Sequence, residues 1–193
     1  MSFDMSEQNV HSIDDAVRAL RSGAVIAYPT EAVYGLGCDP HNEEAFRRLF
    51  ALKRRPPTQG VLLIASDFAQ VGPFVDIASV PAPALARATA TWPGPNTWVF
   101  PRAAGTPAWL AGAHTGIAVR VTAHPLAASL CRAFCGALVS TSANRHGEPP
   151  ARSAAEVRIM FGDALPFVLD GETGGLERPT PIRDAMSGET IRT

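Results

Sequence analysis

"GIAVRVTAHPLAASLCRAFCGALVSTSAN", residues 116–144, holds the pattern that decides the fold. Two short apolar runs, 116–121 and 136–140, have the length and composition of buried strands. The stretch between them, 124–134, is predicted to be a helix. A strand, a helix and a second strand in this order are typical of an α/β protein. Ligands in such proteins bind where polar segments meet the strand ends, and residues 140–144 are such a segment.

The same alternation extends in both directions along the chain. Capping residues mark the predicted helix starts: Ser12, Asn42, and Ser153 with Glu156 in a capping box. The segment 29–40, rich in glycine and proline, is expected to be a loop. The predicted helices are 13–22, 43–53, about 83–91 and one after Ser153. The predicted strands are 24–28, 60–65, the end of 92–100, 167–170, 181–185 and 189–193.

The length of 193 residues fits one domain. Because the last third has more strand than helix, we expect a mixed parallel and antiparallel sheet flanked by helices. Residues 1–9 are acidic and polar, and we expect a disordered or frayed terminus there, followed by a single domain over 10–193.

Charge is distributed unevenly in a chain whose net charge is −1. Arg47, Arg48, Lys53, Arg54 and Arg55 lie within nine residues, and Lys53 is the only lysine. A local basic patch in a near-neutral protein favours an anionic small molecule or a short RNA contact over the wrapping of a duplex.

Several site classes are disfavoured by the sequence. The histidines have no metal-ligand spacing, so a metal held by protein side chains is not expected. There is no Walker loop, no GxGxxG and no GxSxG. Three cysteines without a disulfide spacing indicate a reduced, cytoplasmic protein, and neither a secretory leader nor a membrane-spanning run is predicted.

Three segments could carry chemistry, and each has a simpler alternative. Lys53 and Arg55 suit phosphate oxygens, although they could also be a solvated helix end that complements the helix dipole. Arg120, inside an apolar strand, indicates either an anion site or a structural salt bridge. The hydroxyls and amide of 140–144 could donate to phosphate or carboxylate, or could simply form a turn.

The segments "YPTEAVYGLGCDP", "LKRRP", "WPGPNTWVFP", "AVRVTAHP", "LVSTSAN" and "GETGG…IRDAMSGETIR" follow one another in this order. Together they resemble the YrdC-like threonylcarbamoyl-AMP synthases, in particular the short bacterial single-domain form. The resemblance covers nearly the whole chain. It implies a twisted mixed α/β sheet with a basic concave cavity. It also implies synthesis of threonylcarbamoyl-adenylate and pyrophosphate from ATP, L-threonine and bicarbonate, with Mg²⁺ carried on the ATP phosphates.

The resemblance also implies residue roles and partners. Lys53 and Arg55 would face the ATP phosphates and serve catalysis, with Ser142, Asn144 and Arg192 also binding ATP. Arg120 would hold the threonine carboxylate, with Thr30, Ser140 and Thr180 nearby. Other proteins would move the threonylcarbamoyl group to adenosine 37 of tRNAs that read ANN codons, and direct contact with tRNA or double-stranded RNA stays open.

The chain departs from the longer form of this family at three points. Ala32 stands where that form has the second threonine of its P-T-x-T loop, and a histidine after KxRP is replaced near Ile64. The resemblance to the short form also implies that the extra C-terminal domain, which covers the nucleotide in the longer form, is not expected here. Two alternatives stay open at this point: a non-catalytic RNA-binding module, and a paralogue that acts on another carbamoyl-type substrate.

Overall fold

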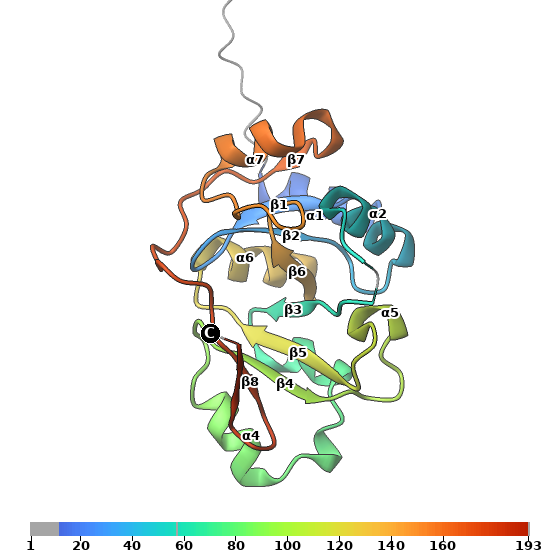
Figure 1. The fold of residues 1–193 in the computed structure, drawn as a ribbon, viewed down its shortest axis with the longest axis vertical. Coiled ribbons are helices and arrows are strands. Elements are labelled where there is room, and N and C mark those ends of the chain that lie inside the picture. Colours follow the sequence, from blue (N-terminus) through green and yellow to red (C-terminus); the bar gives the residue numbers. More distant parts are fainter. Residues whose placement is uncertain (1–11, 57, 193) are drawn as a thin grey trace, which may run out of the picture.

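A computed structural model describes residues 12–56 and 58–192. Within these residues, one sheet of nine strands has the order β7-β1-β2-β6-β3-β5-β4-β8-β9. The strands stack along the length of the molecule, from β1 near one end to β8 near the other (Figure 1). The pairs β1–β7, β3–β5 and β4–β8 are parallel, and the other neighbours are antiparallel. The predicted mixed sheet is therefore confirmed. The prediction for residues 1–9 lies outside the described residues.

The strands are β1 (Ile26–Pro29), β2 (Tyr34–Gly37), β3 (Leu62–Ala65), β4 (Thr97–Pro101), β5 (Gly116–Val121), β6 (Leu138–Ser142), β7 (Phe167–Val168), β8 (Ile182–Asp184) and β9 (Thr190–Arg192). The α-helices are α1 (Ile13–Arg21), α2 (Glu43–Lys53), α3 (Phe68–Val71), α4 (Ala82–Thr89), α5 (Ala108–Ala111), α6 (Pro125–Phe134) and α7 (Ala154–Phe161). Short 3₁₀ turns occupy Gly72–Phe74, Ile77–Ser79 and Gly162–Ala164.

Most predicted elements are present, and two predictions need correction. The segment 29–40 is not wholly a loop, because β2 lies inside it and pairs with β1 and β6. The capping box at the start of α7 is incomplete. Ser153 accepts from the N–H of Glu156 at 3.2 Å, but the Glu156 carboxylate accepts from the N–H of Arg152 instead of Ser153.

Two apolar clusters cover the sheet, and strand alternation decides which residue joins which. Leu63 and Val139 belong to the larger cluster, which includes the buried face of α2. Their neighbours Ile64 and Leu138 belong to the smaller cluster, in which α1 and α6 pack on the sheet. Because side chains alternate along a strand, Ser140 and Ser142 lie on the same face as Leu138. Helices α1 and α6 therefore cover one end of this face, and the other end is open.

None of the helices within the described ranges is long and apolar enough to cross a membrane.

Candidate functional site

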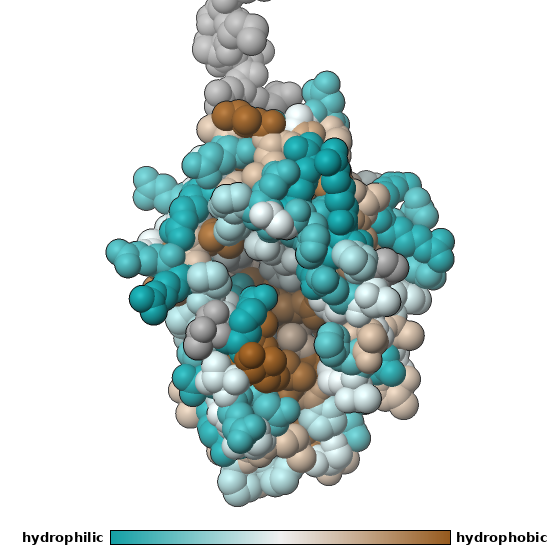
Figure 2. Space-filling model, viewed as in Figure 1, coloured by the Kyte–Doolittle hydropathy of each residue, from teal (hydrophilic) through white to brown (hydrophobic). Residues whose placement is uncertain are grey.

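The open end of this sheet face forms a cavity of about 680 Å³. Its floor and walls come from β2, β3, β5 and β6, from the loop after α2, and from the segment that leads into β8 and β9. Figure 2 shows the hollow near the middle of the molecule, with hydrophobic residues inside and beside it and hydrophilic residues around it. Such a volume suits a ligand of nucleotide size.

All nine residues predicted for the site line this one cavity, although they come from distant parts of the chain. They are Thr30, Lys53, Arg55, Arg120, Ser140, Ser142, Asn144, Thr180 and Arg192. Ala32 lines the cavity as well. The wall therefore has a methyl group at the position where the longer form was expected to have a threonine hydroxyl. Ile64 does not line it, because this side chain is buried in the smaller apolar cluster.

Lys53 is the last residue of α2 and is 3% exposed, so a solvated helix end is excluded. Its ammonium donates to the Ser142 carbonyl, the Asn144 carbonyl at 2.9 Å and Asn144 Oδ1 at 3.1 Å. Its own carbonyl accepts from the N–H of His146 at 2.8 Å. Burial, and then the charge of Arg55, lower the pKa of Lys53 to about 7. Lys53 therefore joins the end of α2 to the turn after β6.

Arg55 follows Lys53 by two residues and lines the same cavity. Its guanidinium donates to Gln59 Oε1 at 2.7 Å, to Thr141 Oγ1 at 3.1 Å and to the Gly60 carbonyl at 2.7 Å. It also lies over the Phe50 ring. Burial, and then Arg192 nearby, lower the pKa of Arg55. These neutral partners leave its charge uncompensated, which suits an anionic ligand.

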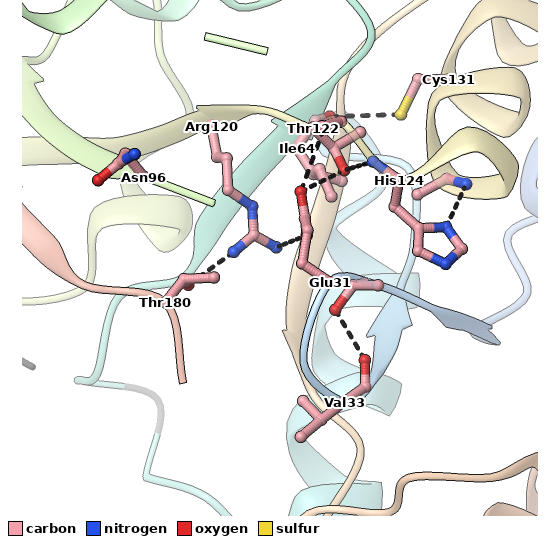
Figure 3. A network of polar contacts seen from close by, with 12 residues as sticks. Glu31, Val33, Ile64, Asn96, Arg120, Thr122, His124, Cys131 and Thr180 are labelled. Carbon is pink, nitrogen blue, oxygen red and sulfur yellow. Dashed lines mark hydrogen bonds and ion pairs between the residues drawn. The ribbon is translucent and has the colours of Figure 1, made fainter. Parts of the chain in front are cut away.

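Arg120 is 4% exposed on β5 and forms the salt bridge that was one of the two interpretations of the sequence. Its Nη2 lies 3.4 Å from Glu31 Oε2, and its Nη1 donates to Thr180 Oγ1 at 2.7 Å. Figure 3 shows the guanidinium between these two side chains. Its Nε has no partner. Arg120 is thus held by a structural ion pair and still lines the cavity with unused donors.

Glu31 was missed by sequence reasoning, although it fixes Arg120. Its Oε1 accepts from Thr122 Oγ1 at 2.7 Å and from the N–H of Ala123 at 3.2 Å. These contacts are shown in Figure 3. A single glutamate in a polar loop is normally solvated, and only the buried charge of Arg120 signalled that a partner was needed.

The remaining hydroxyl and amide groups complete the wall. Thr30 Oγ1 donates to the Val33 carbonyl at 2.7 Å, which keeps the turn before β2 tight. Ser142 Oγ donates to Asn144 Oδ1 at 2.6 Å, the same oxygen that Lys53 uses. The 140–144 segment is therefore a strand end and a tight turn, and its hydroxyls also face the cavity.

Charge in the cavity has one sign. The described residues of its wall include Lys53, Arg55, Arg120 and Arg192, and none is an aspartate or glutamate. The described part of the chain also has no group of three or more His, Cys, Asp or Glu residues that could hold a metal ion. Such a wall can bind two anionic groups side by side and balance negative charge that develops between them.

Known proteins resemble this chain over nearly its whole length. The sequence model of the Sua5/YciO/YrdC family, described as "Telomere recombination", matches residues 18–193. The chain belongs to this family. A relative from Coxiella burnetii, named threonylcarbamoyl-AMP synthase, is 52% identical over 94% of this chain and 96% of its own length. A relative of the same name from Methylococcus capsulatus is 56% identical over 92% of this chain and 94% of its own.

Solved structures of the family share the fold. P. abyssi Sua5 complexed with L-threonine superposes with a TM-score of 0.83 at 31% identity, covering 89% of this chain and 50% of that one. A second P. abyssi Sua5 structure has a TM-score of 0.87, and this chain covers 55% of it. The chain thus spans about half the length of these Sua5 proteins. E. coli YciO shares the fold, with a TM-score of 0.78 at 23% identity.

Proposed function

We propose that this protein is a threonylcarbamoyl-AMP synthase, a nucleotidyltransferase that makes L-threonylcarbamoyladenylate from L-threonine, bicarbonate and ATP. Pyrophosphate and water are the other products. The observation that carries the proposal is the cavity itself. It places Arg120 with Thr180 in one wall and Lys53 with Arg55 in another, in a chain half identical to enzymes of this name.

The two groups of polar residues divide the ligand between them. Arg120, with Thr30, Ser140 and Thr180, is suited to the carboxylate and hydroxyl of threonine. A guanidinium with free donors in a buried site binds carboxylates strongly. Lys53, Arg55, Ser142, Asn144 and Arg192 are suited to the nucleotide, with the cations facing the triphosphate. Apolar lining residues such as Leu110 and Ile182 offer contact area for the base and ribose.

The chemistry has two steps. The neutral amine of threonine attacks the carbon of bicarbonate, a new C–N bond forms, and water leaves to give the carbamate. A carbamate oxygen then attacks the α-phosphorus of ATP, and the bond to the β-phosphate oxygen breaks with release of pyrophosphate. The protein holds the reactants in line and balances the developing negative charge.

Mg²⁺ fits this cavity only as an ion carried on the ATP phosphates, because no carboxylate lines the described wall. When bound there, it would neutralise phosphate charge. We therefore expect no direct bond between the metal ion and a carboxylate of the described wall.

Lys53 takes a different part from Arg55 in this proposal. Its three ammonium donors are occupied by the turn at 142–144, so it positions the nucleotide-facing turn as well as supplying charge. An arginine cannot place three donors in so compact a space. We expect Lys53→Arg to lower turnover more than ATP affinity, and equal turnover would reject this role.

The test is pyrophosphate release by the purified protein with ATP and Mg²⁺, with and without L-threonine and bicarbonate. Release should depend on both. Arg55→Met should abolish it, whereas Arg132→Met should not, because Arg132 is an exposed arginine on α6 that does not line the cavity. Release that needs no threonine would favour a paralogue with another substrate. RNA binding without any release would favour the non-catalytic module.

The product is a mixed anhydride of a carbamate and a phosphate, so it must pass quickly to an acceptor. We propose other proteins of tRNA threonylcarbamoylation as its recipients, in the cytoplasm, with adenosine 37 of tRNAs reading ANN codons as the final acceptor. The open mouth of the cavity supports such a transfer (Figure 2).

A further inference from the structure

Within the described residues, the wall of the cavity has no carboxylate that could form an ion pair with an ammonium ion. Its described wall has four permanently or partly cationic side chains and no carboxylate. Titratable and charged groups face the cavity from α2 and the loop that follows it, from β5 and the loop before it, from the turn after β6, and from β9. They are Lys53, Arg55, His114, Arg120, His146 and Arg192, together with the phenol of Tyr34 on β2.

Glu31 is the one described carboxylate that forms an ion pair with a cation of the wall, and that cation is Arg120. Thr122 and the N–H of Ala123 donate to its Oε1, and Arg120 lies against its Oε2. Glu31 itself does not line the cavity. Figure 3 shows it on the side of the Arg120 guanidinium opposite Thr180, so its charge is already paired with that of Arg120.

An amino acid that enters this space meets different environments at its two charges. Its carboxylate gains a guanidinium. Its ammonium loses water and gains neutral hydroxyl groups and nearby cations but no carboxylate of the described wall, and both the lost water and the nearby positive charge favour the neutral amine. The side-chain amine of Lys53 responds to the same two causes, because burial and then the charge of Arg55 lower its pKa to about 7.

We propose that the cavity binds L-threonine with its α-amine neutral, and that the ammonium proton leaves to solvent during binding. The N–H bond breaks, the electron pair stays on nitrogen, and buffer takes the proton. This inference rests on the proposed function and deepens it. The wall prepares the nucleophile by its charge alone, so the reaction needs no side chain as a general base for the amine.

Titration calorimetry in two buffers of different ionisation enthalpy measures the protons released on binding. L-threonine is compared with (R)-3-hydroxybutyrate, which keeps the carboxylate and hydroxyl but has no amine. Any change in the protonation of Lys53 or the histidines is common to both ligands and cancels. At pH 7 we expect threonine to release about one more proton than the analogue. Its affinity should rise about tenfold per pH unit relative to the analogue between pH 6 and about 8.

A pair of variants tests the cause. Ala118 lines the cavity two residues before Arg120 on β5, so Ala118→Asp adds the missing carboxylate and Ala118→Asn adds the same volume without charge. We expect the aspartate variant to lose the excess proton release and the asparagine variant to retain it.

The outcomes separate this inference from the proposed function. Threonine-dependent pyrophosphate release without excess proton release would overturn the neutral-amine inference alone. It would also be overturned if threonine bound while the analogue did not, because the amine would then be an essential charged contact. Absence of both threonine binding and threonine-dependent release would overturn the proposed function, and this inference with it.

Discussion

At one end of the sheet face that carries Leu138, helices α1 and α6 cover apolar side chains, whereas at the other end the same strands line an open cavity. Along β6, Leu138 is buried under the helices, and Ser140 and Ser142 face the cavity. Along β3, Ile64 is covered and Leu62 lines the cavity. Alternation along a strand therefore selects the face, and helix packing from elsewhere in the chain decides which end stays open.

The two ends also satisfy their polar groups differently. The covered end has few polar atoms to satisfy. The open end contains buried charges, and these are held by a network of long-range contacts such as Arg120–Glu31 and Lys53–Asn144. Substitutions at the covered end should therefore change stability alone, and those at the open end should change ligand binding as well.

The largest effect is expected from Arg120→Met. It leaves Glu31 buried without a counter-charge, and breaking such a pair costs about 3–5 kcal/mol. Threonine-dependent pyrophosphate release should also be lost. Urea denaturation and the release assay measure the two effects. In the double variant Arg120→Met/Glu31→Gln, stability should recover while release stays absent. Recovery of release would contradict the role of Arg120.

Leu138→Ala tests the covered end of the same face. Removal of this fully buried side chain should cost about 2–5 kcal/mol, because it leaves a space between β6 and the helices. Pyrophosphate release per folded molecule should not change below the unfolding transition. A changed threonine affinity in the folded variant would mean that the two ends are coupled.

Two glycines of β2 allow the covered end and the open end to be compared directly. Gly37 lies against Tyr28 in the covered end, and Gly35 lines the cavity. A Cβ at Gly37 would lie 2.6 Å from the Val139 carbonyl and 2.7 Å from the Tyr28 ring, so Gly37→Ala should cost about 1–3 kcal/mol. A Cβ at Gly35 would lie 3.3 Å from Ser140 Oγ and 3.4 Å from Thr30 Cγ2. Gly35→Ala should cost less than about 1 kcal/mol and should weaken threonine binding. The reverse order of stabilities would refute the comparison.

The last prediction is a pH dependence at the open end. The pKa of Lys53 falls from 10.5 to about 7 on folding, mainly through burial, so the unfolded chain binds more protons between these values. The free energy of unfolding should therefore rise with pH above about 7. Lys53→Met removes this contribution, and the difference between the two proteins, measured by urea denaturation from pH 6 to 9, isolates it. A difference that does not vary with pH would show that Lys53 is fully protonated when folded.

The sequence predicted the helices well because their caps are local signals. Ser12 and Asn42 cap the N–H groups of α1 and α2 as expected. Strand β2 was missed because glycine is rare inside strands, and here Gly37 is required by the close approach of Tyr28. That requirement depends on a neighbouring strand and is not visible in the segment itself.

The candidate site was predicted residue by residue, but its electrostatics were not. Lys53 was indistinguishable from a solvated helix end, because its burial depends on a turn about ninety residues later. Glu31 gave no signal of its own for the same reason, since its partners Arg120 and Thr122 lie far along the chain. The roles of the nine residues toward ATP and threonine stay predictions until the binding experiments are made.

The C-terminal hairpin of β8 and β9 has a consequence for how the protein is made. Thr180 and Arg192 reach the ribosome exit after nearly every other part of the wall, and β8 needs β4 already in place to pair with it. A nascent chain can therefore bury much of its core while its pocket is still open on one side. Ligands that bind the finished cavity should stabilise only molecules in which β8 and β9 have already paired, so threonine and ATP would favour the survival of these molecules in cells.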